Sequence, residues 1–392
     1  MAQVTLPTEN GSTETYILGD PKEFEVANAG TMPRIAYSAA HVVADPLSDC
    51  NPSLDTAIDW DATIEYRRYL WSLGLGVADA MDTAQRGMGV DWPNSLELIK
   101  RSIDAAQDFE KGNGVALLAS GGGTDQLEPG AYVTIDDVIG AYEEQCEAIE
   151  GAGGRIILMA SRALAAVATS PDDYLKVYDR ILGQVKEPVI IHWLGEMFDP
   201  ALAGYWGSND HWAAMETCLD MLKNNVAKVD GVKVSLLEAD KEIAMRNKLP
   251  DGVRMYTGDD FNFSDLIAGD DDGYSDALLG IFDAIAPAAS AALAAMGKQD
   301  MAGYHDILGP TLPLSRHIFK DPTRFYKTSV VFLAYLNGHQ QHFLVVGGQE
   351  GTRSTLHLAE LFRLADKAGL FRNPDIAADR MASVMTVHGV AG

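Results

Sequence analysis

The alternation of apolar and polar residues changes character at Arg34. Before it, residues 4–18 alternate on both sides of Asn10-Gly11, a dipeptide that accepts the positive φ angles of a tight turn. We therefore predict an N-terminal β-hairpin. From Arg34 onward, short apolar runs rich in β-branched residues alternate with stretches of helical period.

Eight of these apolar runs are predicted strands, and they begin at residues 34, 76, 114, 155, 188, 231, 254 and 277. Amphipathic helices are predicted between them, for example over 61–74, 94–110 and 170–182, the last with Ser170 and Pro171 as cap and first-turn pair. Strand starts mostly 33 to 42 residues apart are typical of parallel sheets with right-handed crossovers. The pattern predicts a (β/α)₈ TIM barrel over 34–286.

An open doubly wound sheet is the alternative, but no Gly-x-Gly-x-x-Gly follows any strand, and "SGGGTD" at 120–125 leads into a loop. Beyond residue 286 the strands stop, and helical patterns over 287–319, 325–338 and 354–371 predict a C-terminal helical extension. Its apolar faces must pack on the barrel wall or on a second subunit. We thus expect a hairpin extension (1–33), a barrel (34–286) and a helical extension (287–392).

Composition narrows the class of protein. The 392 residues are 47% hydrophobic, which suffices for a large core, and the formal charge of -26 disfavours nucleic acid as a partner. Three widely spaced cysteines indicate reduced thiols rather than a zinc site. The sequence has neither an export signal nor a run of about 18 apolar residues. We expect a cytoplasmic protein with a small polar substrate and no membrane partner.

Polar residues at strand ends are the candidate site, because barrel enzymes place their active sites at the carboxyl ends of the strands. Each has a structural alternative: a carboxylate can cap a loop, an arginine can form a structural ion pair, and a histidine in an apolar run can be a core residue. The candidates are His41, Asp82, Thr83, Gln85, Ser120, Ser161, Arg162, His192, Glu196, Lys233, Ser235, Asp259 and Asp260.

Lys233 is the most informative candidate, because it lies between Val232 and Val234 in a predicted strand. A lysine that points into a barrel needs a partner or a lowered pKa, and a neutral amine forms Schiff bases with ketones and aldehydes. The period also allows Lys233 to point outward. We favour the inward orientation.

The order of elements resembles the dihydrodipicolinate synthase and N-acetylneuraminate lyase superfamily. "GVK" at 231–233 matches its Schiff-base lysine, "RMYTGDD" at 254–260 its Val-x-x-Gly-x-Asp segment, and 305–338 its C-terminal helices. The chain is most similar to the branch known as the domain of unknown function 993 (DUF993). The resemblance implies a class I aldolase-type TIM barrel that needs no cofactor and forms a homo-oligomer.

Three departures put pyruvate recognition in doubt. The family's Gly-Thr-Thr-Gly-Glu loop is replaced by "DTAQRG" at 82–87, which retains only Thr83, and its strand-five tyrosine is replaced by His192 in "HWLGE". The following arginine, which would hold a second carboxylate, has no clear counterpart before Asp199. With a pKa near 6.5, His192 would serve as acid or base at neutral pH.

Three interpretations stay open. In the first, a lyase uses Lys233 as the Schiff-base amine and His192 as proton shuttle, and it binds a sugar-derived or polyhydroxylated carbonyl compound. Its predicted substrate-binding residues are Asp82, Thr83, Gln85, Ser120, Glu196 and Asp259. In the second, a sugar isomerase or epimerase binds a divalent metal ion through His41, Asp82, His192, Glu196 and Asp259. In the third, the barrel binds sugars without catalysis.

The lyase interpretation also predicts a geometry. Strands five and six are neighbours in a (β/α)₈ barrel, so two inward-facing residues at equal height lie within about one side-chain length. Equal height of His192 and Lys233 requires the sixth strand to begin within "KVD" at 228–230.

Overall fold

The computed structural model describes residues 1–27 and 32–390. Residues 28–31, which belong to the predicted N-terminal extension, lie outside the described residues. The predicted hairpin is present as the antiparallel strands β1 (Gln3–Pro7) and β2 (Thr13–Ile17), and Gly11 takes a φ of +82° in the turn.

Eight parallel strands form a closed barrel in the order β10-β3-β4-β5-β6-β7-β8-β9. Each lies within or next to one of the eight predicted runs. Because β10 pairs with β3, the sheet closes on itself, so the predicted TIM barrel is confirmed and the open sheet is wrong. The strands are β3 (Ala36–Ala39), β4 (Gly76–Asp79), β5 (Leu118–Gly122), β6 (Ile156–Leu158), β7 (Val189–Leu194), β8 (Val229–Ser235), β9 (Arg254–Thr257) and β10 (Asp276–Leu279).

Helices follow the strands and continue beyond the barrel. Ser170 and Pro171 start α5 as the sequence predicts, whereas α15 was not among the predicted helices. The helices are α1 (Trp60–Ser72), α2 (Trp92–Asn113), α3 (Ile135–Gly151), α4 (Arg162–Val167), α5 (Pro171–Leu182), α6 (His211–Asn224), α7 (Ala239–Arg246), α8 (Phe263–Ala268), α9 (Ile281–Ala284), α10 (Ala286–Gly297), α11 (Met301–Leu308), α12 (Thr311–Ile318), α13 (Tyr326–Leu336), α14 (Thr355–Lys367) and α15 (Pro374–Val387).

The core has two parts, and each strand divides its side chains between them by alternation. A large cluster fills the layer between barrel and helices and includes Val232 and Val234. A smaller cluster, with Ile190 and Tyr256 among its members, fills the barrel interior. This division tells which way each strand-end residue points.

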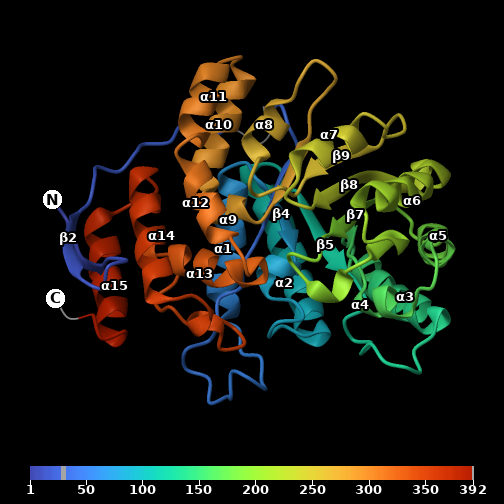
Figure 1. The fold of residues 1–392 in the computed structure, drawn as a ribbon, viewed down its shortest axis with the longest axis horizontal. Helices are drawn as coiled ribbons and strands as arrows, with labels where there is room; N and C mark the ends of the chain where they lie inside the picture. The colour runs from blue at the N-terminus through green and yellow to red at the C-terminus, as the bar shows by residue number, and fades with distance from the viewer. Residues whose placement is uncertain (28–31, 391–392) are drawn as a thin grey trace.

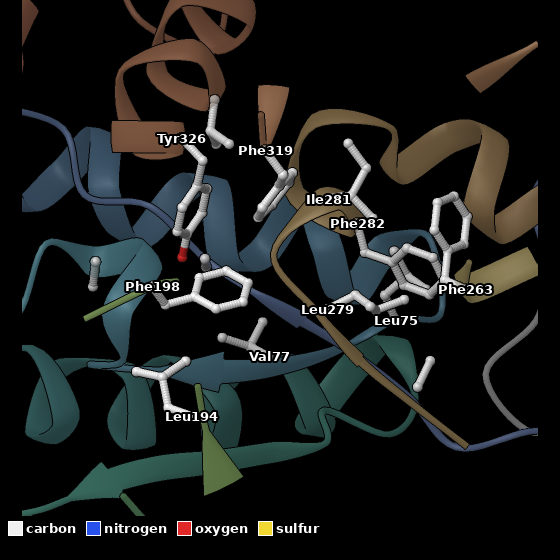
Figure 2. Close-up of a cluster of buried hydrophobic side chains, with 14 of the residues drawn as sticks. Leu75, Val77, Leu194, Phe198, Phe263, Leu279, Ile281, Phe282, Phe319 and Tyr326 are labelled. Atoms are coloured by element: carbon white, nitrogen blue, oxygen red, sulfur yellow. The ribbon is translucent and has the colours of Figure 1, made fainter. Parts of the chain in front are cut away.

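The C-terminal extension packs on its own barrel. In Figure 1, α13, α14 and α15 lie on one side of the barrel, and the N-terminal hairpin lies beside α15. Tyr326 at the start of α13 stacks on Phe319, with ring centroids 4.4 Å apart. It also forms an edge-on contact with Phe198, which follows β7, with ring centroids 6.1 Å apart (Figure 2). The extension therefore reaches the carboxyl ends of the barrel strands.

Cys50, Cys146 and Cys218 are free thiols, as the spacing predicts. Burial raises the pKa of the Cys146 thiol to about 12, so this thiol is unreactive at neutral pH. Within residues 1–27 and 32–390, every helix is too short or too polar to cross a bilayer.

Candidate active site

Lys233 points into the barrel. Its strand neighbours Val232 and Val234 belong to the outer cluster, so residues 231, 233 and 235 face the interior. A Cβ on Gly231 would contact the interior ring of Tyr256 at 2.6 Å, which agrees with this parity. The Lys233 side chain is buried and only 7% exposed. The inward orientation that the sequence favours is therefore the one the structure has.

His192 and Lys233 are direct partners in the register of β7 and β8. Ile190, two residues before His192, lies in the interior cluster, so His192 faces inward as well. Strand β8 begins at Val229, within the "KVD" segment that equal height requires. The predicted neighbourhood of these two side chains is confirmed at the level of the strand register.

Burial makes the Lys233 amine unusually easy to deprotonate. It lowers the pKa of Lys233 to about 8, against the opposing attraction of the Asp260 and Asp82 carboxylates. The same burial raises the pKa of Asp260 to about 7, while its bond from the Ile281 amide (2.8 Å) and the charge of Lys233 favour the ionised carboxylate. Since the two groups interact, they share their titration near neutrality. The protonation states of Lys233 and Asp260 therefore depend on each other near physiological pH.

Gly258 leaves the space that the Lys233 side chain occupies. A Cβ at this position would lie 2.8 Å from Lys233 Cε and still closer to the Ser235 hydroxyl. Real Cβ atoms do not approach side-chain atoms so closely, and β8 and β9 are paired here, so neither strand can move away without breaking the ladder. Gly258 is therefore part of the site, because only glycine admits the lysine.

His192 does not titrate near 6.5, contrary to the sequence prediction. Its pKa is lowered well below that value, first by burial and second by the neighbouring Lys233 charge. Its Nε2 lies 3.2 Å from the Ser235 hydroxyl. At neutral pH His192 is thus a neutral imidazole that orients or accepts a hydrogen bond.

A cavity of about 130 Å³ opens at the carboxyl ends of β4 to β7. It reaches the Lys233–His192 pair from the His192 side, since His192 lines it and Lys233 does not. The charged lining is mixed in sign, which suits a polar uncharged or zwitterion-like ligand better than a purely anionic one. The lining residues include Asp82, Arg86, Asp125, Glu128, Met159, Arg162, Leu194, Asp199 and Leu202.

The two arginines of the lining differ in their free donors. Arg86 is buried, and its guanidinium donates to the carboxylate of Asp125 (2.6 Å), the side-chain oxygen of Gln145 and the carbonyls of Ala80 and Gly121. Arg162 uses Nε on Asp199. Among the described residues, its two terminal nitrogens have no hydrogen-bond partner in the protein, so they can donate to a ligand in the cavity.

The structure places the predicted residues Thr83, Gln85 and Ser120 outside the cavity lining. The Thr83 hydroxyl lies 2.7 Å from the Tyr326 hydroxyl, and the Gln85 amide donates to the Val346 carbonyl of the C-terminal extension. On β5, Ala119 lies in the interior cluster, so Ser120 faces the helices. Thr83 and Gln85 therefore anchor the extension.

Glu196 and Asp259 also have structural partners outside the cavity. Glu196 is ion-paired with His211 at 3.1 Å, and Asp259 accepts hydrogen bonds from the amides of Phe261 (2.8 Å) and Asn262 (3.0 Å). Burial raises the pKa of Asp259, and these amides oppose the shift. Of the predicted substrate-binding residues, only Asp82 lines the cavity.

The five ligands of the alternative metal site are not brought together. His41 is paired with Asp283 at 2.8 Å, and the partners of His192, Glu196 and Asp259 are different again. Within the described part of the chain, no three His, Cys, Asp or Glu side chains form a group that could hold a metal ion.

Sequence reasoning missed two residues of the C-terminal extension, Tyr326 and Lys327. Both are buried, and the Lys327 ammonium lies 3.7 Å from the Asp82 carboxylate. Thr328 and Ser329 separate Lys327 from the apolar run "VVFLAYL" at 330–336. This is a weaker form of the signal at Lys233, which lies directly between two valines, and it was available in the sequence.

Comparison with known proteins gives a family and a fold. The family model described as "Protein of unknown function (DUF993)" matches residues 4–390. The search of curated proteins found no match. Solved structures of dihydrodipicolinate synthase superpose over most of the chain at low identity, which shows the shared fold. The enzyme from Aquifex aeolicus is 11% identical, with a TM-score of 0.63 over 87% of this chain and 100% of its own. The chloride-inhibited enzyme from Acinetobacter baumannii, solved with pyruvate, is 14% identical, with a TM-score of 0.62 over 86% and 99%.

Proposed function

The chain belongs to the DUF993 family, whose description names no function. From the residues of the site we propose that the protein is a Schiff-base lyase of the dihydrodipicolinate synthase type. It acts as an aldolase or dehydratase on a sugar-derived or polyhydroxylated carbonyl compound. The observation that carries this proposal is Lys233, a buried amine with a pKa lowered to about 8 beside the cavity at the carboxyl end of the barrel.

In the proposed reaction, Asp260 takes a proton from the Lys233 ammonium, and the neutral amine attacks the substrate carbonyl carbon. Asp260 gives this proton to the carbinolamine hydroxyl, which leaves as water, and the resulting iminium draws in the electron pair of the bond that breaks at the neighbouring carbon, which gives an enamine. In C–C cleavage, Asp260 accepts the proton of the hydroxyl group beyond that bond, an aldehyde leaves, and the proton is returned to the enamine carbon. In dehydration, Asp260 accepts the proton of the neighbouring carbon and returns it to the departing hydroxyl, which leaves as water. Hydrolysis of the iminium then releases the product and Lys233. His192, as a neutral imidazole, holds a substrate hydroxyl.

Substrate recognition in this proposal rests on the cavity lining. Asp82 and His192 accept hydrogen bonds from hydroxyl groups, and the terminal nitrogens of Arg162 donate to substrate oxygens. Two hydrogen-bond acceptors, Asp82 and His192, and the paired donors of Arg162 suit a substrate with several hydroxyl groups next to a carbonyl. This support favours the polyhydroxylated class over a simple keto acid.

Reductive trapping tests the proposal directly. The protein is incubated with dihydroxyacetone and sodium cyanoborohydride, digested, and mapped by mass spectrometry. We expect a reduced adduct on Lys233. Since its pKa of about 8 lies below that of an ordinary lysine, the trapping rate should rise by about tenfold or more from pH 6.5 to 8.5 and level off near pH 9.

Lys111 is the internal control in the same digest. It is exposed and its pKa is raised by the hydrogen bond to Asp108, so its modification should keep rising beyond pH 9. Adducts confined to exposed lysines, with Lys233 unmodified at every pH, would refute the Schiff-base proposal.

We expect pyruvate to bind weakly. The segment "DTAQRG" lacks the glycine-flanked threonine pair of the relatives, and its one threonine, Thr83, is engaged with Tyr326 at 2.7 Å. Isothermal titration calorimetry should give a dissociation constant in the millimolar range or no heat, that is, a binding free energy of about -4 kcal/mol or weaker. Micromolar affinity would overturn this prediction.

A further inference from the structure

We propose that Lys327, which the C-terminal extension places at the barrel mouth, is a positioning residue that acts on Lys233 through the carboxylate of Asp82. The inference rests on the proposed Schiff-base function of Lys233. It assigns an active-site role to α13, a helix outside the (β/α)₈ repeat.

The Lys327 ammonium is buried and contacts three groups. Its side chain is 1% exposed, and its Nζ lies 3.7 Å from Asp82 Oδ1, 3.1 Å from Met88 Sδ and 3.2 Å from the Arg324 carbonyl. Burying an ammonium costs several kcal/mol unless an opposite charge compensates it. Burial does lower the pKa of Lys327, and Asp82 opposes this most. Asp82 is therefore the main electrostatic partner of Lys327.

Asp82 is shared between two lysines. It favours the charged form of Lys233 as well as that of Lys327. Its Oδ2 atom is buried and has no hydrogen-bond partner among the described residues, and its side chain lines the cavity. The charge of this carboxylate thus acts on both ammonium groups and on the Arg162 guanidinium across the cavity.

The extension also fixes the backbone of the loop that carries Asp82. Tyr326 bonds the Thr83 hydroxyl at 2.7 Å, and the Gln349 amide donates to the Met88 carbonyl at 2.8 Å. A Cβ on Gly89 would contact Gly347 of the extension at 2.8 Å, so the two backbones touch. These contacts fix the backbone on either side of residues 84–87 and so the place from which the Asp82 side chain extends.

The sign of the effect follows from the charges that face each lysine. Asp260 and Asp82 act on Lys233, which has the neutral His192 beside it, and Asp82, Asp199 and Arg162 act on Lys327. Removing the Lys327 charge leaves the Asp82 carboxylate balanced by fewer cations, Lys233 and Arg162. The Lys233 ammonium is then favoured, and less free amine is present at neutral pH.

The test uses the trapping rate at Lys233 with dihydroxyacetone and cyanoborohydride as a function of pH. In Lys327→Met we expect trapping to slow by about three- to tenfold at pH 7.5, with the midpoint of the profile moved upward by about one unit and the high-pH plateau unchanged. Lys327→Arg retains the charge and should retain the wild-type midpoint. Lys327→Gln is the second neutral variant, and it keeps a donor for the Arg324 carbonyl should the methionine variant not fold.

A double-mutant cycle shows whether Lys327 acts through Asp82. In an Asp82→Asn background, Lys327→Met should change the rate by less than about twofold. An unmoved midpoint in both neutral variants, or the same loss in both backgrounds, would overturn the inference while the Schiff-base proposal stands. Absence of a Lys233 adduct in the wild-type protein would instead remove the proposed function, and the inference with it.

Discussion

Replacing Lys233 by alanine is expected to abolish the covalent adduct and to lower imine-dependent catalysis by about a thousandfold or more. The readout is deuterium exchange at the α-carbon of dihydroxyacetone, followed by NMR, because an enamine formed from the imine exchanges this hydrogen quickly. In the proposed mechanism Lys233 supplies the amine, and no other described lysine faces the barrel interior beside His192. Without it the iminium cannot form.

Lys233→Arg is the matched control for this prediction. The guanidinium keeps the positive charge beside Asp260 but has no nucleophilic amine at neutral pH. Exchange should therefore be lost in both variants, while thermal unfolding shows that both remain folded. Exchange at the wild-type rate in Lys233→Ala would exclude the imine mechanism, because the exchange would then not need the Lys233 amine.

Replacing Arg67 by methionine is expected to lower the free energy of unfolding by about 3–5 kcal/mol. Arg67 Nη2 lies 2.8 Å from Asp79 Oδ1, and both side chains are 0% exposed in the layer between α1 and β4. The methionine fills the space but leaves the Asp79 carboxylate buried without its cation. Urea denaturation of both proteins measures the difference.

An exposed ion pair provides the control for Arg67. Arg101 and Glu97 on α2 are 2.7 Å apart, but each side chain is 44% exposed. Because water screens this pair, Arg101→Met should cost only about 0.3–0.5 kcal/mol. Similar losses in the two variants would mean that burial does not govern the strength of the Arg67–Asp79 pair.

The barrel was predictable because its cause is local. Short β-branched runs separated by amphipathic stretches specify strands and helices, and chirality restricts how such units connect. The Lys233–His192 register could also be predicted, since "KVD" continues the strand pattern far enough to raise Lys233 to the height of His192. Helix α15 was missed although its cap, Asn373, and its first residue, Pro374, are ordinary start signals.

The strand-end rule predicted the site only in part, because it does not distinguish the two faces of a strand. Ser120 ends a strand but faces the helices, and Glu196 and Asp259 lie in loops that use their carboxylates for His211 and for backbone amides. The neutral state of His192 was also missed. Its pKa depends on burial and on the charge of Lys233, and neither is encoded in the residues around position 192.

The sequence by itself determined most of the elements, their order and the strand on which Lys233 lies, since these follow from periodicity and from contacts between neighbouring segments. It favoured the inward lysine without deciding it. Only the tertiary structure decided which side chains share the cavity and what their protonation states are. The bond between Thr83 and Tyr326 joins residues 243 positions apart, and Lys327 reaches Asp82 over a similar separation. Such contacts leave no periodic trace in the chain, and the low dielectric that shifts the pKa of Lys233 exists only once the barrel is packed.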